Sequence, residues 1–319
     1  MKVLILGYSS IVARFALPAL LRTAGVDRVD IGSRRRLDRS DLPAGFAGDL
    51  YLGYAEALKT SDAELVYVSL VNSLHEQWAE AALASGRHVI VDKPAFLSLD
   101  ATRRLDEMAR KSGLCLAEAA VFTDHPQVGE IRRIVEKSQG ITRVLAAFSF
   151  PPLADKNFRN HPELGGGSLY DLGTYAAATD QLFFDSRPRE ITCRVLRCHS
   201  TTGVDTAFSV LAIHDCGGAM LGHFGFDTEY QNWVTAIGPD LALSVERIFT
   251  IPSDYENQIT VSRRNERSTV TASAGSSFTL YFGRLIRAIQ EGDWKMDREA
   301  LLRNAAFVER MRSSEEREA

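Results

Sequence analysis

The first 118 residues alternate short apolar runs, rich in β-branched side chains, with segments of helical periodicity. The runs predict strands, and the periodic segments between them predict helices. We expect strands at 2–6, 29–31, 64–70, 88–91 and 114–118, and helices at 11–22, 73–85 and 98–112. Because such alternation forms βαβ units with right-handed crossovers, the sequence predicts an α/β domain of Rossmann type, with a doubly wound parallel sheet, over 1–122.

The second half is β-rich and has few helical segments. After a strand from about 140 to 150 and a helix at 168–182, seven runs are separated by short turns. The predicted strands are 191–198, 204–214, 218–226, 231–238, 242–245, 257–262 and 268–272, and helices follow at 276–290 and 296–311. We therefore expect an α+β domain over 123–319 with a large open, mainly antiparallel sheet. Its closing helices can pack back on the first domain.

Composition argues against several classes of function. The net charge of -4 gives no basic field for nucleic acid or an anionic membrane. No run approaches the ~20 apolar residues of a membrane span, and the start of the chain does not resemble a signal peptide. The four cysteines lack CxxC spacing, so we expect reduced thiols in the cytoplasm and no metal site.

The turn after the first run is a candidate phosphate cradle. In a GxGxxG motif, small residues let the backbone approach a pyrophosphate at a helix N-terminus. Here the three motif positions are Gly7, Ser9 and Val12, so the motif by itself is weak. The hydroxyls of Ser9 and Ser10 can cap the helix or bind phosphate oxygens, and Ile11 completes the candidate turn.

The end of the second run bears on the choice of cofactor. An acidic residue there usually binds the ribose 2′-hydroxyl of NAD, but this chain has Gly32-Ser33-Arg34-Arg35. An arginine fork suits a 2′-phosphate, so Ser33, Arg34 and Arg35 favour NADP(H) over NAD(H). The alternative is that these arginines belong to a solvated loop.

The fourth run ends in Asp92-Lys93-Pro94, where the proline stops the strand. Ligands of open α/β sheets bind outside the carboxyl ends of the strands, so Lys93 would face a ligand. An ordinary solvated Asp–Lys pair is the other interpretation.

Three further segments accompany these turns: Val71-Asn72-Ser73 with His75, Glu118, and His125-Pro126-Gln127. In this order they resemble the family of glucose–fructose oxidoreductase, inositol dehydrogenase and rhizopine-catabolism proteins (Gfo/Idh/MocA). The resemblance implies that Asn72, His75, Asp92 and Lys93 lie around the nicotinamide. Asp92 stands where the family has Glu, which preserves the charge with a shorter reach.

A second motif begins at Gly165-Gly166-Gly167, whose glycines would permit close approach of the backbone to a ligand. The helix that follows carries Asp171 and Tyr175 four residues apart, on one face. Spacing alone is also compatible with a surface Asp–Tyr pair. The resemblance implies that Tyr175 is the acid/base with Asp171 beside it, as in the sugar-oxidoreductase branch, which Asn157-Phe158-Arg159 also resembles.

The expected reaction is hydride transfer between a nicotinamide cofactor and a hydroxyl or ketone of a sugar or nucleotide sugar. A free phenol has a pKa of ~10, and a nearby ammonium such as that of Lys93 would lower it. Asp171 would orient the substrate hydroxyl or Lys93. Arg159 and His161 are candidate substrate contacts, and Arg159 would suit a diphosphate.

Two other functions use the same features. One is a non-catalytic NADP-sensing regulatory protein, and the other is a trans-dihydrodiol or pentose dehydrogenase. For either function, and for the enzyme above, the open sheet of the second half favours a homodimer or homotetramer.

Overall fold

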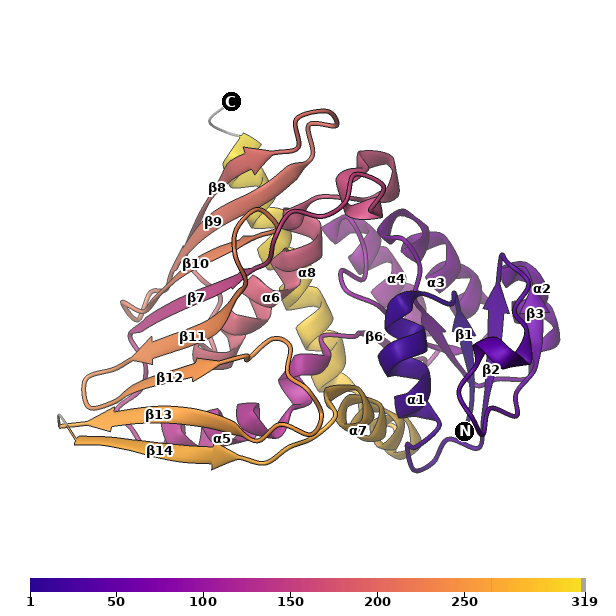
Figure 1. Cartoon of the computed structure of the whole chain (residues 1–319), viewed down its shortest axis with the longest axis horizontal. Coiled ribbons are helices and arrows are strands. Elements are labelled where there is room, and N and C mark those ends of the chain that lie inside the picture. The colour runs from indigo at the N-terminus through magenta and orange to yellow at the C-terminus, as the bar shows by residue number, and fades with distance from the viewer. Residues whose placement is uncertain (265, 317–319) are drawn as a thin grey trace. The chain divides into compact units, whose positions relative to one another are not determined.

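The structure is a computed structural model that describes residues 1–264 and 266–316. The described chain divides into two compact units (Figure 1). Unit 1 comprises residues 1–121 and 278–305, and unit 2 comprises residues 122–277 and 306–316.

Unit 1 is built on a parallel sheet with the strand order β3-β2-β1-β4-β5-β6. Its strands are β1 (Lys2–Leu6), β2 (Arg28–Ser33), β3 (Leu50–Leu52), β4 (Leu65–Val68), β5 (His88–Val91) and β6 (Leu116–Glu118). Its helices are α1 (Leu17–Leu20), α2 (Tyr54–Thr60), α3 (His75–Ala84), α4 (Leu99–Lys111), α7 (Ser277–Glu291) and the first part of α8 (Lys295–Glu316). The doubly wound fold predicted from the alternation is confirmed.

Both faces of this sheet are buried, which explains the uninterrupted apolar runs. Along β1, Val3 and Ile5 point into one hydrophobic cluster, and Leu4 and Leu6 point into another. The first cluster includes side chains of α1 and α7, and the second includes side chains of α2, α3 and α4.

Three details of unit 1 differ from expectation. Strand β3 and helix α2 were not predicted from the sequence, because both are short and Leu52 at the edge of the sheet is 65% exposed. The helix predicted from residue 11 opens as a π-helical turn at Val12–Ala16 before α1. Pro18 has no N–H to donate to the preceding turn, which interrupts regular α-helical bonding there.

Unit 2 contains an eight-stranded sheet with the order β14-β13-β12-β11-β7-β10-β9-β8. Among the described strands of this sheet, only β7 and β10 pair in parallel, so the prediction of a mainly antiparallel sheet is confirmed. The strands are β7 (Arg143–Ser149), β8 (Glu190–Cys198), β9 (Asp205–Ile213), β10 (Ala219–Gly225), β11 (Gln231–Ile237), β12 (Ala242–Glu246), β13 (Asn257–Arg263) and β14 (Glu266–Ala272). Helices α5 (Pro126–Glu136) and α6 (Ser168–Phe183) belong to the same unit.

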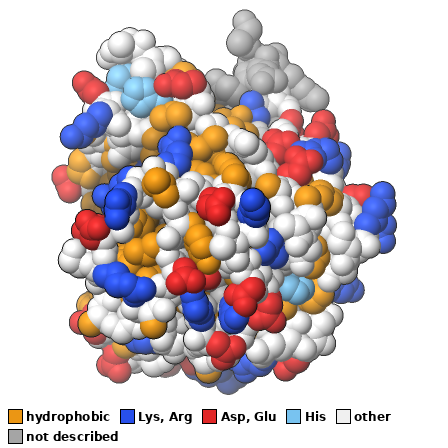
Figure 2. Space-filling view, turned by 90° about the vertical axis from the view of Figure 1, so that its right-hand side faces the viewer, with side chains coloured by type: hydrophobic (Ala, Val, Ile, Leu, Met, Phe, Trp, Pro, Cys, Tyr) orange, Lys and Arg blue, Asp and Glu red, His pale blue; other side chains and the backbone are white. Residues whose placement is uncertain are grey.

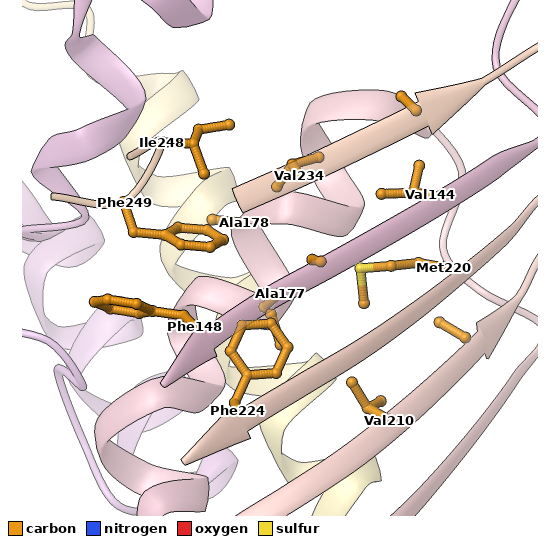
Figure 3. Close-up of a cluster of buried hydrophobic side chains, with 14 of the residues drawn as sticks. Val144, Phe148, Ala177, Ala178, Val210, Met220, Phe224, Val234, Ile248 and Phe249 are labelled. Atoms are coloured by element: carbon orange, nitrogen blue, oxygen red, sulfur yellow. The ribbon is translucent and has the colours of Figure 1, made fainter. Parts of the chain in front are cut away.

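One face of this sheet packs on α6 and forms a single hydrophobic core (Figure 3). The core contains aromatic side chains at one end of the sheet, including Phe148, Phe224 and Phe249. His214 is buried, and its Nε2 lies 2.8 Å from Oδ1 of Asp180. On the opposite face, several leucines of β8, β9 and β10 remain exposed.

Within the described residues, no helix is long and apolar enough to cross a membrane. The described part of the chain also contains no cluster of three or more His, Cys, Asp or Glu side chains that would hold a metal ion. On the face shown in Figure 2, acidic and basic side chains are interspersed with apolar ones.

Candidate active site

In unit 1 the candidate residues follow the carboxyl ends of neighbouring strands. The strand order reverses between β1 and β4, and ligands of doubly wound sheets bind at such a point. Gly7 follows β1 and Ser69 follows β4, while Asp92 and Lys93 follow β5. The parallel register therefore brings three turns that are far apart in the sequence to one edge of the sheet.

Gly7 occupies a position that a larger residue would not fit. Its φ is 102°, and a Cβ there would lie 2.2 Å from the carbonyl oxygen of Ser69. The N–H of Gly7 donates to the carbonyl of Gly32 at 2.9 Å. Oγ of Ser9 accepts the N–H of Val12 at 3.1 Å, so this serine caps the helical segment as expected. The turn is tight and offers the backbone to a ligand, although it has only one glycine of the usual three.

The other residues of this turn divide into exposed and buried positions. Ser10 and Ile11 are exposed at the start of the helical segment. Val12, at the third motif position, is fully buried and packs with the core on one face of the sheet.

A chain of hydroxyls connects the Gly7 turn to Asp92. Oγ of Ser9 lies 3.0 Å from Oγ of Ser69, which donates to Oδ2 of Asp92 at 2.5 Å. The hydroxyl of Tyr67 donates to the other carboxylate oxygen, Oδ1. Burial, and then the negative charge of Asp92, raise the pKa of Tyr67, so this phenol stays protonated. Tyr67 and Ser69 could not be predicted as partners from the sequence, because only the pairing of β4 with β5 brings them to Asp92.

His75 connects two backbone turns. Its Nδ1 lies 2.9 Å from the carbonyl oxygen of Pro94, and its Nε2 lies 3.1 Å from that of Leu70. The imidazole is fully buried, and burial lowers its pKa, so it is neutral near pH 7 and its single N–H donates to only one of these two carbonyls. His75 therefore holds the backbone next to Lys93. The Lys93–Pro94 peptide bond is cis, Lys93 is half-buried and Asn72 is buried.

The end of β2 carries a cluster of basic side chains. Ser33 is buried, and its Oγ accepts the N–H of Arg35 at 3.2 Å. Arg34 and Arg35 are exposed, and the guanidinium carbon of Arg35 lies 5.8 Å from the centre of the Tyr8 ring. The buried serine thus shapes a turn whose basic side chains reach solvent beside the Gly7 turn.

In unit 2, Asp171 forms a partly buried ion pair. Its Oδ2 lies 2.8 Å from Nε of Arg159, whose guanidinium carbon is 4.7 Å from the centre of the Phe158 ring. The side chain of Asp171 is 4% exposed and that of Arg159 is 25% exposed. The charge of each residue is therefore balanced locally by the other.

The glycine run accommodates the protein's own groups. A Cβ at Gly166 would lie 2.5 Å from the carbonyl oxygen of Arg159, and one at Gly167 would lie 2.4 Å from Oδ1 of Asp205. Oδ2 of Asp205 accepts the hydroxyl of Ser168 and the N–H of Leu169, both at 2.6 Å, and so caps α6. Protein atoms therefore fill the space that a side chain would need at Gly166 and Gly167, and the approach of these glycines to a ligand stays a prediction.

His161 lies in the loop before this run. Its Nε2 is 3.1 Å from the carbonyl oxygen of Asp155, and its Nδ1 is 3.3 Å from Oε1 of Glu163. Both ring nitrogens therefore contact groups of its own loop.

Tyr175 lies one turn after Asp171 on α6 and is half-buried among three phenylalanines. The centre of its ring lies 4.9 Å from that of Phe148, 5.4 Å from that of Phe249 and 5.5 Å from that of Phe122. Figure 3 shows Phe148 and Phe249 at the edge of the core of unit 2. These contacts fix the plane of the phenol and place it in apolar surroundings, where a charge nearby has a large effect.

Two family models match the chain. Residues 1–136 match the oxidoreductase family with a NAD-binding Rossmann fold, and residues 133–244 match the Gfo/Idh/MocA C-terminal domain. Together the two models span the parallel sheet and much of the second sheet.

Named relatives align over nearly the whole chain. The dTDP-3,4-didehydro-2,6-dideoxy-alpha-D-glucose 3-reductase of Actinomadura kijaniata is 28% identical over 318 residues, which cover 98% of this chain and 95% of that protein. The D-xylose 1-dehydrogenase (NADP(+)) 2 of Haloferax volcanii is 28% identical over 302 residues, or 92% and 91% of the two chains.

A solved structure of a 3-ketoreductase from A. kijaniata, in complex with NADP and TDP-benzene, matches with a TM-score of 0.92. The sequence identity is 28%, and the match covers 99% of this chain and 98% of that one. Solved structures of that reductase include a Tyr-to-Phe and a Lys-to-Ala variant.

Proposed function

Because the chain belongs to the Gfo/Idh/MocA oxidoreductase family, we propose that it transfers a hydride between NADP(H) and a hydroxyl or ketone carbon of a sugar or nucleotide sugar. The observation that carries this proposal is the setting of Tyr175, a phenol held by three aromatic rings one turn after the Asp171–Arg159 pair. The similarity to a reductase crystallised with NADP and a TDP derivative supports the choice of cofactor and substrate class.

The residues of unit 1 fit a dinucleotide. The Gly7 turn, with Ser9, Ser10 and Ile11, would receive the pyrophosphate, because it lies where the chain passes from β1 into a helical segment. Ser33, Arg34 and Arg35 would bind the 2′-phosphate, which accounts for a preference for NADP(H) over NAD(H). When bound, the nicotinamide accepts or supplies the hydride.

Asn72, His75, Asp92 and Lys93 would lie toward the nicotinamide end of the cofactor. The bonds of His75 and Asp92 hold the turn that carries Lys93. We assign Lys93 a catalytic role because an ammonium at this turn would favour the phenolate of the acid/base.

Tyr175 is the proposed acid/base. When hydride leaves or reaches a carbinol carbon, the oxygen on that carbon must lose or gain a proton. The phenol hydroxyl would exchange this proton, with its pKa lowered by the ammonium of Lys93. Asp171 would act through Arg159, and Arg159 and His161 are the proposed substrate contacts in the loop before α6.

Two substitutions test the mechanism. Tyr175→Phe and Lys93→Ala should each lower turnover by about 100-fold or more, the range of general acid–base catalysis, while the Kd for NADPH, followed by tryptophan fluorescence, changes only a few-fold. Tyr170→Phe is the matched control, because Tyr170 lies on the same helix with its ring 4.8 Å from the guanidinium carbon of Arg312. Turnover of the wild-type level in either variant would remove that residue from the mechanism.

A substrate panel separates the alternatives. NADPH oxidation and NADP reduction are measured with ketosugars, nucleotide sugars, pentoses and trans-dihydrodiols. Cofactor binding without turnover of any compound would favour the non-catalytic NADP sensor, and turnover of pentoses or dihydrodiols alone would favour a dehydrogenase of those compounds. The Arg34→Asp variant is run in parallel, and an unchanged preference for NADPH over NADH would contradict the assignment of the 2′-phosphate site.

We also propose a homodimer or homotetramer through the exposed face of the unit 2 sheet. On that face Leu211 of β9 pairs with Leu221 of β10, which pairs with Leu145 of β7. Leu211 is 36% exposed and Leu221 is 40% exposed, and apolar side chains gathered on one face favour association.

We assign the protein to the cytoplasm, where its four free cysteines would stay reduced.

A further inference from the structure

The loop between β12 and β13 begins with a residue in an unfavourable backbone conformation. Arg247 has a φ of 53°, and among the described residues other than glycine only Arg264 also has a positive φ. Left-handed backbone is disfavoured for L-residues and persists where the surrounding structure holds it, often at ligand sites. We call residues 247–250 the Arg247 loop.

Three buried amide side chains hold this loop. Nε2 of Gln127 donates to the carbonyls of Ile248 at 3.0 Å and of Arg247 at 3.4 Å. Nδ2 of Asn257 in turn donates to Oε1 of Gln127 at 2.6 Å. Oδ1 of Asn232 accepts the N–H of Phe249 at 3.0 Å, and the backbone carbonyl of Asn232 accepts the N–H of Arg247 at 2.6 Å.

These amides come from separate parts of unit 2. Gln127 belongs to α5, Asn232 to β11 and Asn257 to β13, and each is at most 3% exposed. Gln127 is the last residue of the His125-Pro126-Gln127 segment, and its side chain holds this loop in place. The fold thus commits three buried polar groups to a single short segment.

The loop places two side chains on opposite sides. Phe249 points into the core and contacts the ring of Tyr175. Arg247 points to solvent, with its guanidinium carbon 6.0 Å from the centre of the Tyr230 ring. It forms no ion pair with any residue that the structure describes.

Tyr230 is held from the same loop. It is 39% exposed, and its hydroxyl lies 2.9 Å from Oγ1 of Thr250 and accepts Nδ2 of Asn232 at 2.8 Å. Oε1 of the neighbouring acid, Glu229, accepts the N–H of Tyr230 at 3.2 Å. An arginine and an aromatic ring are therefore presented together on a fixed backbone.

We propose that Arg247 and Tyr230 form a substrate subsite that binds the diphosphate of a nucleoside diphosphate sugar. The inference rests on the proposed function and adds where the substrate's charge is bound. A guanidinium fork matches phosphate oxygens, and a loop that is already ordered loses little entropy on binding. Arg159 suits this role less well, since its charge is balanced by Asp171 at 2.8 Å.

Binding of the diphosphate tests the subsite without any need for turnover. Thymidine diphosphate, inorganic pyrophosphate and a hexuronate are titrated calorimetrically into the full chain saturated with NADP. Arg247→Ala should weaken thymidine diphosphate by about 10- to 100-fold, the usual effect of losing a charge-assisted hydrogen bond, and leave NADP binding unchanged. Arg247→Lys, which keeps the charge but loses the fork, should give an intermediate loss.

The matched control is Arg264→Ala. Arg264 has the same left-handed backbone, with a φ of 48°, but follows β13 at the end opposite Asn257. The subsite would be overturned if Arg247→Ala and wild type bind diphosphate equally. It would also be overturned if hexuronate binding depends on Arg247 and diphosphate binding does not. Diphosphate binding that depends on Arg247, in a protein without turnover, would instead leave the subsite standing and reject the proposed function.

Discussion

Oε1 of Glu118 accepts the backbone N–H of Ala95 at 2.8 Å, two residues after Lys93. The other oxygen, Oε2, accepts the side-chain amide of Asn304 at 2.6 Å, and the carbonyl of Glu118 accepts the hydroxyl of Tyr281 at 2.9 Å. Glu118, at the end of β6, thus connects the Lys93 turn to α7 and α8 of unit 1. We infer that it positions the backbone of Lys93.

Glu118→Ala should therefore lower kcat by about 10- to 100-fold, because small displacements of catalytic groups are costly. Glu118→Gln keeps an acceptor for Ala95 and should recover most of the rate. Asp106→Ala is the control, since Asp106 binds Arg298 of α8 at 2.6 Å and makes no contact with the turn among those described. A kcat of Glu118→Ala that equals that of Asp106→Ala would contradict the positioning role.

Gly7→Ala should destabilise the protein and weaken NADPH binding. The new Cβ would lie 2.2 Å from the carbonyl oxygen of Ser69, so the backbone must shift, in addition to about 1–2 kcal/mol for a left-handed alanine. Gly45→Ala separates the two effects, because Gly45 has a φ of 87° and no neighbour within 4 Å of an added Cβ. Urea unfolding and NADPH titration of both variants provide the measurements. Equal losses of stability in the two variants would show that the contact with Ser69 adds no cost.

The stability of the protein should fall as the pH drops below about 6.5. Burial lowers the pKa of His75, His88 and His125 in the folded state, so these rings stay neutral after the unfolded chain has bound protons. The contribution of each neutral ring to the free energy of unfolding is fully present above the pKa of histidine in the unfolded chain. It is lost as the pH falls toward the lower pKa of the folded state, by up to about 1.4 kcal/mol per pH unit for each ring. His75→Gln should flatten this dependence between pH 7 and pH 5 in urea unfolding, and the exposed His223→Gln should not. Equal slopes in wild type and His75→Gln would count against a neutral His75.

Leu221→Asp should reduce the proposed oligomer to a monomer. The substitution places a charge in the centre of the exposed apolar rows of the unit 2 sheet, where its desolvation would oppose association. Leu52→Asp is a matched control in unit 1, since Leu52 is 65% exposed at the edge of the parallel sheet. Sedimentation velocity of wild type and both variants measures the outcome. A monomeric wild type would rule out the assembly.

Much of the architecture followed from local patterns. The apolar run at 2–6 predicted a strand, and β1 forms there with Val3 and Leu4 in separate hydrophobic clusters. The spacing of Asp171 and Tyr175 predicted one helix face, and α6 includes both residues. The helix predicted at 296–311 is longer in the structure, where α8 spans Lys295–Glu316, and residues 317–319 lie outside the described residues.

The sequence by itself determined which segments form strands and helices, since periodic burial of apolar side chains is encoded within a few neighbouring positions. It did not determine which polar groups would meet. The partners of Asp92 come from β4, the acid that caps α6 comes from β9, and the amides that hold Arg247 come from three separate elements. Each of these contacts depends on strand register and on close packing between distant segments. Only the tertiary structure therefore decided which groups Asp92, Gly167 and Gln127 contact.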